Sequence, residues 1–144
     1  MGASLEAEAM SHLEEISDEG IAAMARAGTV GVLLPTTAYI LRLKPPPARA
    51  MIESGVPVAL GTDFNPNAFC LSMPLVMHLA CVLLKMSLNE ALTAATLHSA
   101  HSLRKATTHG SIEPGKFADM VVLDSPRPKF TGFLNSGQIL EQQI

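Results

Sequence analysis

The chain of 144 residues has no tryptophan, a single tyrosine and only 16% charged residues. Ten basic residues stand against thirteen acidic ones, which gives a net charge of −3 at pH 7. Nucleic acids and anionic membranes are bound by basic patches, and this chain has no run of lysines and arginines. We therefore expect neither a nucleic acid nor a membrane as a partner. The length of the chain fits one domain at most.

Long apolar runs are also missing. The longest, at 30–34 and 56–60, are far shorter than the roughly 20 residues that span a bilayer. Residues 1–8 carry carboxylates where a secretory signal needs positive charge, so we expect a cytoplasmic protein. Cys70 and Cys81 are too few for a disulfide scaffold, and we expect both to be free, inert thiols.

The first half of the chain repeats a pattern of short apolar strand, turn and amphipathic helix, which is typical of α/β proteins. Apolar runs without polar alternation predict parallel strands that are covered on both faces. We expect Asp18 to cap the first helix and 36–42 to be a connector. The expected strands are 9–12, 29–34 and 56–63, and the expected helices between them are 18–27 and 48–54.

The second half begins with a loop at 64–68 and continues with an apolar helix at 73–85. A second helix follows, for which Ser87 and Glu90 form a capping box. Residues 110–124 read as two short strands joined by a Pro-Gly turn, which is a change to hairpin architecture.

Three groups of polar residues follow the predicted strands directly: His12, the segment 35–37 and Asp63. Enzymes of the β/α type place their sites at the carboxyl ends of parallel strands. Asp63 there is a metal ligand or proton acceptor, or else a turn or helix-cap carboxylate. His12 is a catalytic group or a hydrogen-bonded structural histidine. Thr36 and Thr37 have no neighbouring base, so a nucleophile is unsupported.

His98 and His101 lie three residues apart on a predicted helix, a spacing that suits a metal. They have no adjacent carboxylate, so we expect a structural or surface role for both. The sequence also has no Walker loop and no Gly-x-Gly-x-x-Gly, which leaves nucleotide chemistry without support.

Several motifs together resemble the C-terminal part of the imidazolonepropionase family, within the metal-dependent amidohydrolases. The resemblance spans about residues 8–127, and Gly-Thr-Asp-Phe-Asn-Pro at 61–66 is its most specific piece. The motifs that carry it are 11–15, 32–35, 59–66, 110–116 and 118–124.

The resemblance implies an α/β fold that is the C-terminal part, about strands 6 to 8, of a TIM-like (β/α)8 barrel with part of a small β-sandwich. Residues 1–109 would be the partial barrel, 110–127 the sandwich strands and 128–144 a divergent, loosely ordered tail. A complete barrel takes about 250 residues, so we expect this chain to be a truncated piece of one.

The implied reaction is hydrolysis of the ring amide of 4-imidazolone-5-propanoate to N-formimino-L-glutamate, a step of histidine breakdown. Asp63 would be a metal ligand that also handles the proton of the attacking water. His12 would be a second catalytic group, and Asn65, Asn67 and Ala68 would lie against the small-molecule substrate.

One divalent metal, zinc or iron, is implied for the complete enzyme. The other family ligands, a His-x-His pair and a further histidine, are absent here, so we expect no tight metal binding by this chain alone. Two alternatives remain: a non-catalytic product that associates with the full-length enzyme or with itself, and another amidohydrolase such as a deaminase-like enzyme.

Overall fold

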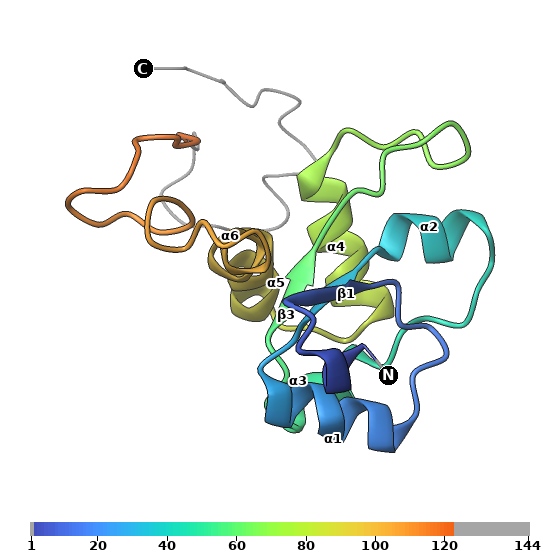
Figure 1. Ribbon diagram of the computed structural model, residues 1–144. Coiled ribbons are helices and arrows are strands. Elements are labelled where there is room, and N and C mark those ends of the chain that lie inside the picture. Colours follow the sequence, from blue (N-terminus) through green and yellow to red (C-terminus); the bar gives the residue numbers. More distant parts are fainter. Residues whose placement is uncertain (1, 123–144) are drawn as a thin grey trace.

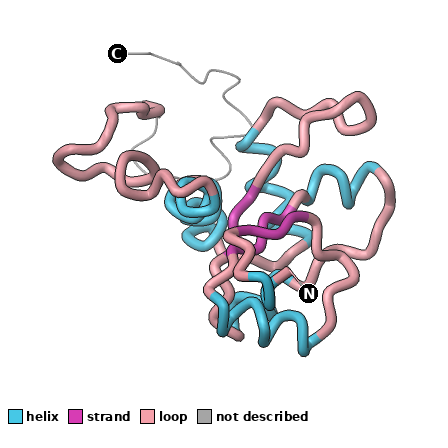
Figure 2. Tube along the Cα trace, in the orientation of Figure 1, coloured by secondary structure: helices cyan, strands magenta, loops and turns pink. Residues whose placement is uncertain are grey.

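The structure is a computed structural model that describes residues 2–122, so the tail predicted at 128–144 lies outside the described residues. The strands lie near the centre, with helices around them (Figures 1 and 2). No helix in the described range is long and apolar enough to cross a bilayer. The elements in chain order are η1 Ala3–Leu5, β1 Ala9–Ser11, α1 Asp18–Ala27, β2 Val30–Leu33, α2 Pro35–Ile40, α3 Ala48–Glu53, β3 Val58–Leu60, α4 Met73–Leu83, α5 Leu88–Ala95 and α6 Leu97–Ser102.

The three strands form one parallel sheet in the order β1-β2-β3. Ser11 aligns with Val32, and Leu33 aligns with Leu60. The central strand is apolar along its length, and both Val30 and Leu33 are fully buried. The predicted parallel sheet is therefore confirmed, and each strand is shorter than its predicted range. Strands β2 and β3 are largely buried, whereas β1 is half-buried and ends at the exposed Ser11.

A glycine in the central strand lets two helices approach the sheet. A Cβ atom at Gly31 would lie 2.4 Å from Cε of Met51 in α3 and 3.6 Å from Cε of Met24 in α1. Both methionines are buried in the main hydrophobic cluster, together with Leu33. The crossover helices α1 and α3 thus cover the same face of the sheet (Figure 1).

The N-cap of helix α1 is Ser17, one residue before the Asp18 that the sequence predicts. Ser17 has an extended backbone, and its side chain accepts a hydrogen bond from the N–H of Gly20 at 3.2 Å, so Asp18 is the first helical residue rather than the cap. Helix α5 begins as predicted. The Glu90 N–H donates to Ser87 Oγ at 3.3 Å, and the Ser87 N–H donates to Glu90 Oε2 at 2.7 Å.

The expected connector at 36–42 is wrong, because α2 begins directly after β2. Pro35 occupies the first helical turn, where its missing N–H costs nothing and its fixed φ favours the helix. Thr36 and Thr37 are buried, so packing outweighs the low helix propensity of these β-branched residues.

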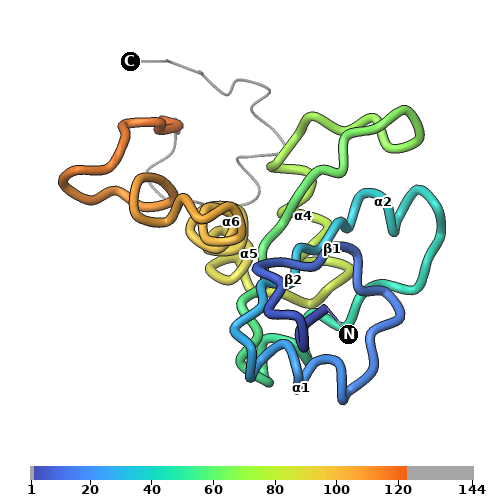
Figure 3. The backbone as a smooth tube through the Cα atoms, viewed as in Figure 1, coloured from blue at the N-terminus to red at the C-terminus, as the bar shows by residue number. Residues whose placement is uncertain are grey.

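The expected hairpin at 110–124 is not formed over the described residues 110–122. This range contains turns and one isolated bridge residue at Val122, and residues 123 and 124 lie outside the description. Figure 3 shows this segment, in orange, extending away from the sheet. Ile112 and Phe117 are exposed, and a two-stranded hairpin that packs on nothing is marginal in water.

The outer edge of β3 is covered by α6. The hydrogen bonds of β2 and β3 use the carbonyl of Pro57 and the N–H of Gly61, so the carbonyls of Val58 and Leu60 point to the other side. His98 Nδ1 lies 2.9 Å from the Val58 oxygen, and the Ser99 hydroxyl lies 3.1 Å from the Leu60 oxygen and 2.7 Å from the Ala94 oxygen, between which its one proton is shared. Side chains of α6 therefore contact the two outward carbonyls of β3.

An ion pair between Arg49 and Glu90 joins α3 to α5. The Arg49 guanidinium donates through two nitrogens to the two carboxylate oxygens of Glu90, at 2.8 and 2.9 Å. Arg49 also donates to Glu53 on its own helix at 3.1 Å. The guanidinium, with the Ser87 N–H, lowers the pKa of Glu90 to about 2 from 4.5.

We expect Arg49→Met to lower the free energy of unfolding at neutral pH, measured by urea denaturation. The pKa of Glu90 is depressed in the folded state, so the pair stabilises fully above pH 4.5 and its contribution is lost as the pH falls toward 2. The difference between wild type and variant should therefore shrink over that range. Glu53→Gln, which removes an exposed pair, is the control and should have little effect. A difference that does not depend on pH would contradict this account.

Candidate functional site

Three of the predicted site segments lie together at one edge of the sheet. His12 follows β1, Pro35 follows β2, and Asp63 comes three residues after the end of β3. Because the strands are parallel, their carboxyl ends meet at the same edge, which we call the strand-end rim. His12 and Asp63 have positive φ angles of 70° and 50°, a conformation that L residues rarely adopt and that clusters at functional sites.

The carboxylate of Asp63 is held by α2. The Thr37 hydroxyl donates to Asp63 Oδ2 at 2.6 Å, and Thr37 is almost completely buried. A short hydrogen bond to a carboxylate fixes the position of that oxygen. The sequence indicates no partner for the Thr37 hydroxyl among the neighbouring residues. In the structure its partner is Asp63, 26 residues further along the chain.

His12 extends the ladder of β1 by one residue, because its N–H donates to the Val32 oxygen at 3.0 Å. Its side chain is 45% exposed, and its Nδ1 lies 3.6 Å from Oε1 of Glu14. No hydrogen bond joins His12 to Asp63 within residues 2–122. The two groups follow β1 and β3, which lie on opposite sides of β2. Glu14 is a site residue that the sequence did not single out.

The loop after Asp63 is closed by Asn65. Its Nδ2 donates to the Asp63 carbonyl at 2.6 Å, and its Oδ1 accepts from the N–H groups of Asn67 at 2.9 Å and Ala68 at 3.1 Å. Asn65 and Ala68 also form a backbone bridge. The amide of Asn65 is thus used inside the loop, where it shapes the chain next to Asp63. Ala68 is buried, whereas Asn67 is exposed at the loop tip.

The described residues alone do not fit a metal centre. Within residues 2–122 no three His, Cys, Asp or Glu side chains lie close enough to share an ion. His98, which the spacing made a possible ligand, bonds to the Val58 carbonyl, so the structural role expected for it is confirmed. Cys70 and Cys81 are free, as predicted, and burial raises the pKa of the Cys81 thiol.

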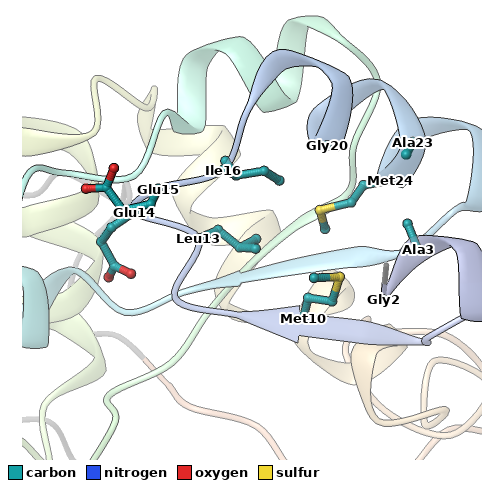
Figure 4. Close-up of a pocket in the computed structure, with 10 residues that line it drawn as sticks. All are labelled: Gly2, Ala3, Met10, Leu13, Glu14, Glu15, Ile16, Gly20, Ala23 and Met24. Carbon is teal, nitrogen blue, oxygen red and sulfur yellow. The ribbon is translucent and has the colours of Figure 1, made fainter.

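A pocket of about 410 Å³ lies between η1, β1, α1 and the segment 13–16 that follows His12. Figure 4 shows the apolar side chains of Met10, Leu13 and Met24 facing its interior, while Glu14 and Glu15 lie at one end with their carboxylates turned away. None of the predicted site residues lines this pocket. It is a recess over the hydrophobic core that adjoins the rim at Glu14.

The model of the amidohydrolase family matches residues 4–142, which is nearly the whole chain. This chain belongs to the amidohydrolase family. Amidohydrolases are hydrolases.

The curated relatives of this amidohydrolase chain include probable imidazolonepropionases. The one from Nematostella vectensis is 69% identical over 127 residues, which cover 88% of this chain and 30% of the relative. The human one is 61% identical over 127 residues, again 88% of this chain and 30% of the relative. The chain therefore spans about a third of the length of the relatives that it matches.

Solved amidohydrolase structures have the same fold. An adenosine deaminase from Xanthomonas campestris with bound zinc superposes with a TM-score of 0.74 at 31% identity, over 81% of this chain and 28% of that one. Guanine deaminase from E. coli superposes with a TM-score of 0.73 at 24% identity, over 80% of this chain and 28% of that one. Metal dependence is typical of the family, as the zinc in the first structure illustrates.

Replacing Thr37 by valine should destabilise the amidohydrolase chain by about 1.5–3 kcal/mol, because it removes a hydrogen bond to the carboxylate of Asp63 while keeping the shape. Thr36→Val is the matched control. The Thr36 hydroxyl is buried without a partner in the described part of the chain, so its removal should be neutral or stabilising. Urea denaturation of both variants measures the difference, and equal effects would show that the Thr37 hydroxyl does not hold Asp63.

Proposed function

We propose that this chain carries the His12 and Asp63 side of an imidazolonepropionase, the hydrolase that opens the ring of 4-imidazolone-5-propanoate. The observation that carries the proposal is the identity of 61–69% to proteins of that name over 127 residues. The stretch Gly-Thr-Asp-Phe-Asn-Pro at 61–66 supports it, since Asp63 follows a buried parallel strand. In this proposal β1, β2 and β3 are strands 6 to 8 of a (β/α)8 barrel.

The reaction adds water to the carbonyl carbon of the ring amide. The carbon–nitrogen bond breaks, the water oxygen becomes part of a new carboxylate, and the ring nitrogen leaves with a proton, giving N-formimino-L-glutamate. A group that takes a proton from water and one that hands it to nitrogen are both required. We assign the first role to Asp63, whose carboxylate is fixed by Thr37, and place His12 next to the substrate as the second proton-handling group.

Asn65 acts in this proposal by shaping the loop beside Asp63, since both ends of its side-chain amide are used within the loop. Asn67 at the exposed tip would then be the residue of this loop that faces the substrate, whereas the N–H and carbonyl of Ala68 already bond within the loop.

A single divalent metal, zinc or iron, belongs to the complete enzyme in this proposal, and Asp63 would supply one ligand. A catalytic zinc site takes about three protein ligands, and the described residues do not supply the others. No step of the reaction is therefore assigned to a metal here.

The test is a chimera in which residues 8–127 of this chain replace the matching segment of the Nematostella vectensis relative. We expect the chimera to convert 4-imidazolone-5-propanoate to N-formimino-L-glutamate, followed by chromatography. Asp63→Asn should reduce kcat by about a hundredfold or more, because it removes the proton acceptor. Asp119→Asn makes the same chemical change on a side chain that is 79% exposed, and should leave kcat unchanged.

The chimera also separates this function from that of a deaminase, the class of the two solved structures described above. Adenosine and guanine should release no ammonia with the chimera. Ammonia release from adenosine or guanine, without ring opening of 4-imidazolone-5-propanoate, would overturn the proposal.

Association with another polypeptide is a second candidate, favoured by the open edge of β1. Glu8 and His12 bond to β2, so the N–H and carbonyl groups of Ala9 and Ser11 point to the opposite side, where no strand lies within residues 2–122. Unpaired strand edges readily pair with another strand. We propose that this edge accepts a strand from another polypeptide, either the full-length enzyme or a second copy of this chain.

Ser11→Pro tests the association, because proline removes an outward N–H while leaving the bonds to β2 in place. We expect wild type to co-purify with tagged full-length enzyme or to sediment as a dimer, and Ser11→Pro to lose that association. Ser11→Ala, which keeps the N–H, is the control. A wild-type chain that sediments as a monomer and never binds the full-length enzyme would contradict the proposal.

A further inference from the structure

Glu14 is a buried acid that the proposed reaction does not use. Its side chain is only 12% exposed, and its Oε1 is buried without a hydrogen-bond partner in the described part of the chain. An unpaired carboxylate oxygen in such a position is costly, because it has lost water and gained no donor. A donor directed at this oxygen is therefore expected.

The side chain that faces this oxygen is His12. Its Nδ1 lies 3.6 Å from Glu14 Oε1, slightly beyond a hydrogen bond. Since the His12 ring is 45% exposed, a small rotation has the room to shorten that distance. The ring can act as the missing donor only if its proton is on Nδ1.

The backbone that brings His12 and Glu14 together is in an unfavourable conformation. His12 and Leu13 are consecutive residues with φ of 70° and 72°, and neither is glycine. Two left-handed residues in a row turn the chain sharply after β1, so that Glu14 comes back beside His12 rather than continuing away from the sheet. Strained backbone of this kind persists where the surroundings hold it, and it concentrates at functional sites.

We propose that Glu14 is a positioning residue that holds the His12 ring in the tautomer with hydrogen on Nδ1. The other nitrogen, Nε2, then carries a lone pair and can accept a hydrogen bond or a proton at the strand-end rim. Carboxylates set the tautomer of catalytic and metal-binding histidines in the same way. The assignment of the tautomer is a property of this chain, whereas its use in catalysis rests on the proposed function.

The tautomer is measured directly by nitrogen NMR of histidine-labelled protein at about pH 8, where an ordinary imidazole is neutral. The His12 signals are assigned by their loss in His12→Asn. We expect wild type to have hydrogen mainly on Nδ1, and Glu14→Leu to reduce that population by about twofold or more. Glu15→Leu, a change in the exposed neighbouring acid, is the matched control and should leave the population unchanged.

Glu14→Gln keeps the size of the side chain and an oxygen acceptor, so it should retain more of the Nδ1–H form than Glu14→Leu does. A wild-type ring with hydrogen mainly on Nε2, or a ring population that is the same in wild type and Glu14→Leu, would overturn the proposal. These results do not depend on activity, so they stand even if the chimera fails to open the imidazolone ring.

In an active chimera, Glu14→Leu should lower kcat about tenfold or more with little change in KM, because it changes the protonation of a reacting group rather than substrate binding. Equal effects on kcat by Glu14→Leu and Glu15→Leu would overturn the link between the tautomer and the reaction.

Discussion

The parallel pairing of β1 and β3 on the two sides of β2 is the constraint from which the other features follow. Parallel neighbours need crossover helices, and α1 and α3 supply them on one face, close enough to β2 that Gly31 has no room for a side chain. The same direction of all three strands collects their carboxyl ends at one edge. The strand-end rim is therefore a consequence of the sheet, and its position does not depend on contacts made by the loops.

The elements that the sequence predicts well are those whose signals are local. Buried apolar runs located the strands, and the pair Ser87 and Glu90 located the start of α5, because each depends on a few neighbouring residues. Helix α2 was missed, since the proline that favours its first turn is followed by threonines, and only burial against the rest of the fold explains their helical conformation. The hairpin prediction at 110–124 was wrong over the described residues 110–122 for the opposite reason. Its local turn signal is clear, but a two-stranded hairpin needs other structure to pack against.

The candidate site divides in the same way. That His12 and Asp63 share one edge follows from the sequence, because each lies at the carboxyl end of a strand that the sequence predicts. The bond from Thr37 to Asp63 does not, since it joins residues 26 apart and depends on how α2 leaves the end of β2. Glu14 was overlooked because it approaches His12 through two consecutive residues with left-handed backbone, His12 and Leu13. No residue type in this stretch predicts such a conformation. Glycine is the usual signal for such a turn, and it is absent here.

The two edges of the sheet differ, and the difference bears on how the rest of a barrel can be added. At β3 the outward carbonyls of Val58 and Leu60 already have partners in His98 and Ser99, whereas no strand pairs with the outer side of β1 in the described residues. A strand that arrives at β3 must replace those side-chain bonds with backbone bonds. Such an exchange of one hydrogen bond for another is nearly neutral in free energy, since each is worth about 1 kcal/mol net. A strand that arrives at β1 displaces only water, so pairing there gains the new bonds outright, and growth of the sheet is favoured first at the edge that carries His12.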